Sequence, residues 1–139
     1  MNMNISNDVI LNKITNIENC LRRIQQIKSR TDFDLKNYDI QDALVLNLQR
    51  ACQASIDLAL HVCKRKKLGP PQESVDAFRF LMRFDLIPEE IIQRMEKMVG
   101  FRNIAIHEYQ SLNLSILESI INKHLQDFTD FTEAVFKII

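Results

Sequence analysis

A long amphipathic helix with a sharp end is predicted by residues 44–71, whose sequence is LVLNLQRACQASIDLALHVCKRKKLGPP. Apolar or small side chains recur every three or four residues and form one helical face. They are Leu44, Leu48, Ala51, Ser55, Leu58 and Val62. The helix opens near Asp39. Four consecutive cations at 64–67 favour the negative end of a helix dipole, and Gly69 with two prolines after it supplies a glycine stop that the chain cannot pass in helical form.

An apolar stripe with the same period precedes this segment. From Val9 to about Arg30, apolar residues recur in steps of three and four, which predicts another helix. They are Ile10, Ile14, Ile17, Leu21, Ile24 and Ile27. Ser6 or Asn7 is expected to cap the start of this helix by accepting a backbone hydrogen bond. The polar residues 31–39 predict a loop between two antiparallel helices.

Three further helices are predicted after the break. Residues 74–84 form a shorter one. Pro88, with two glutamates after it, is typical of a helix start, and that helix continues toward Arg102 and beyond. A last helix runs from about Asn113 to the end of the chain. We therefore predict an all-α fold, an antiparallel bundle of about five helices that forms one domain over residues 1–139.

The composition supports a helical, globular chain. With 139 residues, 46% of them hydrophobic and 26% charged, the chain has the size and composition of one soluble domain. Two glycines and three prolines are too few for the many turns of a β fold. The 18 basic and 18 acidic side chains balance, which excludes a protein that coats nucleic acid non-specifically. Any RNA binding must therefore be local.

The cysteines and the N-terminal residues narrow the possibilities further. Cys20, Cys52 and Cys63 are odd in number and lack the spacing of a zinc site or a disulfide framework, so we expect neither. The first ten residues lack a basic region followed by an apolar one, and no segment approaches about 18 consecutive apolar residues. We expect neither secretion nor membrane insertion, and hence a cytoplasmic protein.

Polar side chains gather in one segment, residues 101–109, with the sequence FRNIAIHEY. Four of them are candidate site residues, namely Arg102, Asn103, His107 and Tyr109. At about 100° per residue, Arg102 and Tyr109 lie within about 20° of each other on a helix, while Asn103 and His107 form a second pair. One interpretation of this cluster is structural, because such residues can cap carbonyls and hold one another at a helix end. The other is a functional site.

The spacing of Arg102, four residues, His107, one residue and Tyr109 resembles the signature of HEPN domains, specifically of the HepT branch, the toxin of MNT–HEPN toxin–antitoxin modules. The resemblance covers nearly the whole chain: its length, the order of five helices, the stretch LQRACQASIDLALHV, and the motif before the last helix. It implies a type VII-like toxin that acts as a homodimer, with both motifs in a shared cleft. It also implies a cognate MNT-type nucleotidyltransferase antitoxin that transfers AMP to Tyr109.

The resemblance implies a metal-independent endoribonuclease without a cofactor, and the residue chemistry suits that role. RNA carries its own nucleophile, the 2′-hydroxyl next to each phosphate. His107, with a reference pKa of about 6.5, suits the removal and return of protons. The permanent charge of Arg102 suits the stabilisation of negative charge at the phosphate. Asn103 is expected to orient the phosphate or His107.

Two other functions remain open from the sequence. In the first, the domain is a non-catalytic helical partner that presents substrate or nucleotide to a separate nucleotidyltransferase; Arg102 then holds a phosphate and His107 is structural. In the second, the bundle is purely structural. The cations at 64–67 suit either an RNA backbone or a solvated helix end. His61 and His124 lie on apolar stripes, so we expect both to be packed structural residues.

A surplus of apolar residues lies outside the main stripes of the second and last helices. It comprises Leu46, Ile56, Leu112, Leu114, Ile116, Ile120, Ile138 and Ile139. Such a surplus predicts a second apolar surface, which suits the interface of the homodimer that the resemblance implies.

Overall fold

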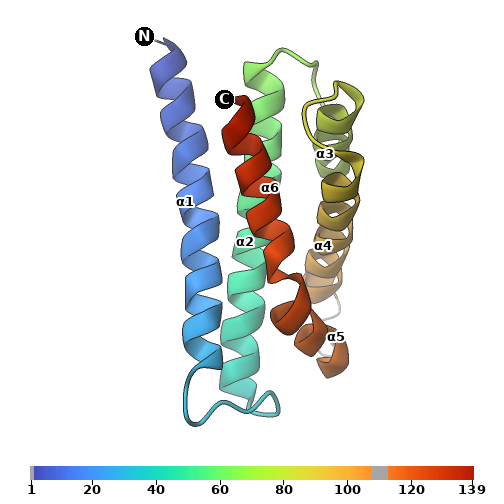
Figure 1. Cartoon of the computed structure of the whole chain (residues 1–139). Coiled ribbons are helices and arrows are strands. Elements are labelled where there is room, and N and C mark those ends of the chain that lie inside the picture. The colour runs from blue at the N-terminus through green and yellow to red at the C-terminus, as the bar shows by residue number, and fades with distance from the viewer. Residues whose placement is uncertain (1, 108–112) are drawn as a thin grey trace.

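The computed structural model describes residues 2–107 and 113–139, and all regular secondary structure in these two ranges is helical (Figure 1). The elements are α1 (Asn2–Lys28), α2 (Tyr38–Arg65), α3 (Ser74–Arg83), α4 (Glu89–His107), α5 (Leu114–Ser119), the π-helix η2 (Ile120–His124) and α6 (Leu125–Ile138). The last three follow one another without a break and form one bent rod. Across the part of the chain that is described, no helix is long and apolar enough to cross a membrane.

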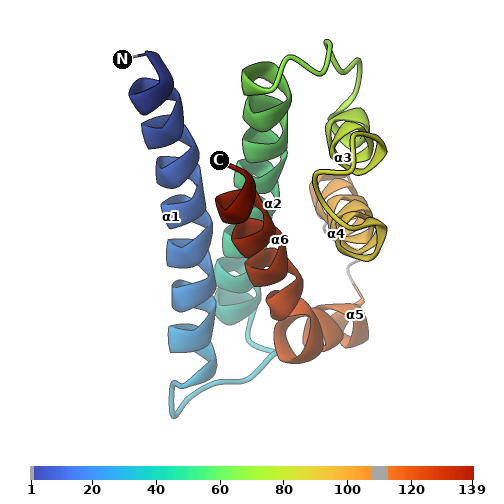
Figure 2. The ribbon, with the colours of Figure 1, turned by 45° about the horizontal axis from the view of Figure 1, so that its top comes forward.

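The helices form the antiparallel bundle that the sequence predicts. α1 and α2 run side by side in opposite directions, and α6 lies against both (Figure 1). α3 and α4 pack together on the other side of α2 from α1 (Figure 2). The two ends of the chain lie at the same end of the bundle (Figure 1). This arrangement places the second half of α4 against the middle of α2.

One continuous hydrophobic core joins the helices. The predicted face of α2, from Leu44 to Val62, is buried, and so are most of the predicted stripe residues of α1. α3 and α6 meet through the rings of Phe78 and Phe131, which are fully buried and pack edge to face with centroids 5.4 Å apart. The helical periodicity therefore predicted the core-facing surfaces correctly.

The helix ends differ from the predictions in three places. α1 begins at Asn2, not Val9, so Ser6 and Asn7 are interior residues and not caps. α2 is capped by Asn37, whose Oδ1 accepts hydrogen bonds from two backbone N–H groups, so Asp39 lies one residue inside the helix. At the other end of α2, the sequence predicted Gly69 as the residue that ends the helix. The first residue in the left-handed conformation is instead Lys67, with a φ of 57°.

A π-helical turn interrupts the last helix and corrects the prediction for His124. A π-turn bonds residue i to i+5, so it rotates the residues that follow relative to an unbroken α-helix. His124 therefore leaves the apolar stripe, and its side chain is half exposed instead of packed. Lys28 stabilises the turn, because its Nζ donates a hydrogen bond of 2.8 Å to the backbone oxygen of Ile121.

Most of the surplus apolar residues are absorbed by the core, so the predicted second surface is smaller than expected. Ile56 and Ile120 are buried, and three more pack partly against the core, namely Leu114, Ile138 and Ile139. Leu46 and Ile116 remain exposed. Leu112 lies outside the described residues.

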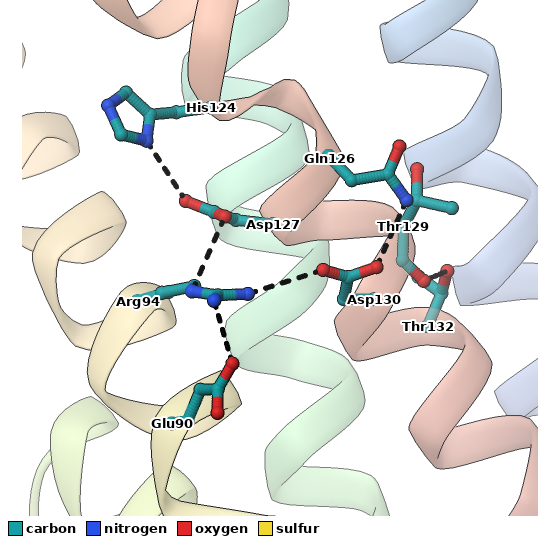
Figure 3. A network of polar contacts seen from close by, with 8 residues as sticks. All are labelled: Glu90, Arg94, His124, Gln126, Asp127, Thr129, Asp130 and Thr132. Carbon is teal, nitrogen blue, oxygen red and sulfur yellow. Dashed lines mark hydrogen bonds and ion pairs between the residues drawn. The ribbon is translucent and has the colours of Figure 1, made fainter.

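A charged network fastens α4 to α6 (Figure 3). Arg94 on α4 lies 2.8 Å from the carboxylate of Glu90, 3.4 Å from that of Asp130 and 4.0 Å from that of Asp127. The Nδ1 atom of His124 approaches Asp127 at 3.5 Å. Because Asp127 and Asp130 lie on α6, their contacts with Arg94 hold α4 against α6 two turns before the polar motif.

Candidate active site

The polar motif begins in the last two turns of α4. The helix continues without interruption through Gly100 to His107, its last residue. Arg102 and His107 thus lie about 7.5 Å apart along the helix axis, at about 1.5 Å per residue. The side chain of His107 and all of Tyr109 lie outside the described residues, so their predicted roles carry over as proposals.

Two neutral amide oxygens hold the guanidinium of Arg102. Its Nη2 donates to Oε1 of Gln53 on α2 at 2.7 Å, and its Nη1 donates to Oδ1 of the adjacent Asn103 at 3.1 Å. Among the described residues, no carboxylate pairs with Arg102. These two bonds orient the guanidinium and do not neutralise it. Of its five N–H donors, they use two, and the other three have no hydrogen-bond partner in the part of the chain that the structure describes.

Gln53 is itself fixed by a chain of contacts that reaches α1. Its Nε2 donates to Oδ1 of Asp57 at 3.0 Å, and Lys13 on α1 lies 3.7 Å from the other carboxylate oxygen. The carboxylate accepts only from the NH₂ end of the amide, while Arg102 donates only to its oxygen. Both neighbours therefore select the same orientation of the Gln53 amide.

A buried thiol next to Gln53 in the sequence also joins α2 to α4. Cys52, fully buried, lies 3.5 Å from the backbone oxygen of Met98, to which its Sγ donates, and this contact joins α2 to α4. Burial raises the pKa of the Cys52 thiol to about 12, although the charge of Arg102 acts in the opposite direction. The thiol is thus protonated at neutral pH, so it neither neutralises Arg102 nor acts as a nucleophile.

An apolar groove borders the other side of α4. With a volume of about 890 Å³, it runs between α4 and the α5–η2 segment, and its apolar lining includes Phe101, Ile104 and Ile116. Ile104 and Ile116 are 49% and 48% exposed, which is high for large apolar side chains. Ile104, which lines the groove, directly follows Asn103 in the sequence. The polar motif and this apolar surface therefore lie on the same helix.

The structure brings together two of the four predicted site residues, Arg102 and Asn103, and adds Gln53, which the sequence analysis missed. Gln53 is one of several polar residues on α2 and has no distinctive spacing relative to the motif. Its importance follows only from the packing of α2 against α4. Asp57, four residues further along, was missed for the same reason.

The helical fold and the position of the polar motif define an all-α protein of the HEPN class. Residues 14–135 match the family described as "Ribonuclease HepT-like". The chain belongs to this HepT-like family.

Known relatives agree with this assignment. The mRNA nuclease HepT of Shewanella oneidensis is 43% identical over 129 residues, which cover 93% of this chain and 97% of that protein. The tRNA nuclease HepT of Aphanizomenon flos-aquae is 25% identical over 82% of this chain and 80% of its own length. A solved structure of the tri-AMPylated S. oneidensis HEPN toxin in complex with MNT antitoxin superimposes with a TM-score of 0.88 at 42% identity, covering 94% of this chain and 98% of that one.

Proposed function

We propose that this chain, as one HEPN-like domain, is the toxin of an MNT–HEPN pair and cleaves RNA in the cytoplasm. The observation that carries this proposal is the near full-length identity of 43% to an mRNA nuclease of the same family. The state of Arg102 agrees with it, because a guanidinium held by uncharged acceptors keeps its full charge for a phosphate.

In the proposed reaction, His107 takes the proton of a ribose 2′-hydroxyl, and the oxygen then attacks the adjacent phosphorus. The bond from phosphorus to the 5′-oxygen breaks, and the protonated His107 returns its proton to that oxygen as it leaves. Arg102 stabilises the extra negative charge on the phosphoryl oxygens as it develops. The products are a 2′,3′-cyclic phosphate and a 5′-hydroxyl. Neither a metal nor a cofactor takes part in this scheme.

Asn103 is proposed as a positioning residue for Arg102. The sequence suggested that it orients the phosphate or His107, whereas its Oδ1 accepts from Arg102 Nη1 at 3.1 Å. The Asn103 amide fixes one edge of the guanidinium group and contributes no charge.

Purified protein should cleave single-stranded RNA in excess EDTA and leave 2′,3′-cyclic phosphate and 5′-hydroxyl ends, which mass spectrometry of the fragments identifies. His107→Ala should lower kcat by at least about 100-fold, because general acid–base catalysis typically contributes factors of about 10² to 10⁴. His61→Ala is the matched control for the loss of an imidazole and should stay within about threefold of wild type. Circular dichroism checks that both variants are folded.

Three outcomes would count against this function. They are persistent loss of cleavage in EDTA, fragments with 3′-hydroxyl ends, and wild-type rates in folded His107→Ala protein. RNA or nucleotide binding without any cleavage would instead favour the non-catalytic partner of a nucleotidyltransferase.

We further propose that the toxin acts as a homodimer whose interface includes the apolar groove beside α4. Arg102 and His107 are five residues apart on one helix, which corresponds to about 140° around the helix axis. A second copy would bring another motif to the same cleft. The exposed Ile104 and Ile116 supply apolar area for such an interface next to the motif.

Light scattering at micromolar concentration should give a mass of twice the 16.3 kDa of one chain. Ile116→Glu should shift the mass toward one chain and lower cleavage, since it places a charge in the apolar interface. Phe84→Glu, which changes another exposed apolar residue, should leave the dimer intact. A wild-type monomer that cleaves RNA at full rate would contradict the shared site.

Tyr109 is proposed as the residue that accepts AMP from the antitoxin. The resemblance assigns that role to this position, and the S. oneidensis relative has been solved in a tri-AMPylated state. On a helix, Tyr109 and Arg102 would lie on one side. A nucleotide attached there would place an anion beside the guanidinium and block RNA by charge and by volume.

Co-expression with the MNT-type nucleotidyltransferase should yield toxin with AMP on Tyr109, which peptide mass spectrometry locates. Tyr109→Phe should lack the adduct, keep its nuclease activity and resist neutralisation. Tyr38→Phe serves as the control, because Tyr38 is the other tyrosine of the chain and is 78% exposed. Full neutralisation with unmodified Tyr109 would mean that the antitoxin acts by occlusion.

A further inference from the structure

A second groove lies between α1 and α2, and Gln53 is one of the residues that line it. Its volume is about 410 Å³, and its lining includes three cations, Lys13 and Arg23 from α1 and Arg50 from α2. Asp57 is the one carboxylate among the residues that line it. The groove is therefore positively charged, although the chain as a whole is neutral.

The two arginines of this groove have no counter-charge within the described part of the chain. Lys13 pairs with Asp57, but neither Arg23 nor Arg50 has an ion-pair or hydrogen-bond partner among residues 2–107 and 113–139. Both guanidinium groups are exposed. They come from different helices, yet both act on the thiol of Cys20. Burial raises the pKa of this thiol, and the charges of Arg23 and Arg50 offset part of that rise. The two charges thus converge on one part of the groove.

The groove adjoins the proposed catalytic arginine through one shared residue. Gln53 lines the groove and also accepts the hydrogen bond from Arg102. A strand that ran from Arg102 past Gln53 would therefore enter the groove that Arg23 and Arg50 line. Asn16 and Asn19 line the same path and add amide groups.

We propose that this groove binds the RNA backbone on one side of the cleaved phosphate, with Arg23 and Arg50 each holding a phosphate. The proposal rests on the nuclease function above and extends it to a substrate length. Guanidinium groups bind phosphates through paired hydrogen bonds, and unneutralised arginines in a polar groove suit such a ligand. An acidic segment of a partner protein is the competing ligand. RNA is favoured because the groove adjoins Arg102.

The test compares the double variant Arg23→Gln/Arg50→Gln with the control Lys36→Gln/Arg83→Gln, which removes two exposed cations from elsewhere on the surface. We expect kcat/KM for a 20-nucleotide single-stranded RNA to fall by about 10- to 100-fold in the arginine variant, mainly through KM. The slope of log kcat/KM against log salt should become shallower by about 1.4, because each lost phosphate contact contributes about 0.7 for single strands. Cleavage of a dinucleotide, whose only phosphate is the scissile one, should stay within about twofold.

Several results would overturn the proposal. One is an arginine variant whose kcat/KM for the 20-nucleotide RNA equals that of wild type. Others are an equal fall in kcat/KM in the control variant and an equal fall in kcat/KM of the arginine variant for the dinucleotide. Loss of binding to the antitoxin with unchanged RNA cleavage would assign the groove to a protein partner.

Binding measurements separate this proposal from the function on which it rests. Wild-type protein that cleaves no RNA would refute the nuclease function. Fluorescence anisotropy of a labelled 20-nucleotide RNA, with His107→Ala protein as the background, tests the groove without cleavage. Addition of Arg23→Gln/Arg50→Gln should then raise Kd by at least about tenfold, and an unchanged Kd would refute the groove.

Discussion

The hydrogen bond between Arg102 and Gln53 is the contact on which the proposed site depends. It crosses from α4 to α2, and its acceptor is an amide, so it fixes the guanidinium without cancelling its charge. Asp57 and Lys13 extend the chain of contacts to α1. Three helices therefore set the position of one cation, and the packing of the bundle becomes a condition for the chemistry.

The periodicity of apolar residues was enough to predict the fold. The stripes beginning at Ile10 and Leu44 have only one way to be buried, against other helices, so an antiparallel bundle followed from them. The features that were missed depend on local backbone conformation, which contributes less free energy than burial of the apolar stripes. Lys67 takes a left-handed conformation that glycine would adopt more easily, and the π-turn at 120–124 changes the register of the last helix and exposes His124.

The candidate site was predictable where its residues share one helix and not where they come from two. Arg102, His107 and Tyr109 stand close together in the sequence, and their spacing carried the resemblance to the family. Gln53 lies 49 residues before Arg102, and its spacing carries no signal. The same holds for the groove, because Arg23 and Arg50 become neighbours only when α1 packs on α2.

The cleavage rate of Gln53→Glu tests most directly whether the free charge of Arg102 is required. This change keeps an oxygen acceptor for Arg102 but pairs its charge with a carboxylate, so kcat/KM should fall by about tenfold or more in protein that remains folded. Gln72→Glu adds the same charge at an exposed position between α2 and α3 and should have little effect. A Gln53→Glu protein that cleaves RNA at the wild-type rate would contradict the claim that an unneutralised Arg102 drives the reaction.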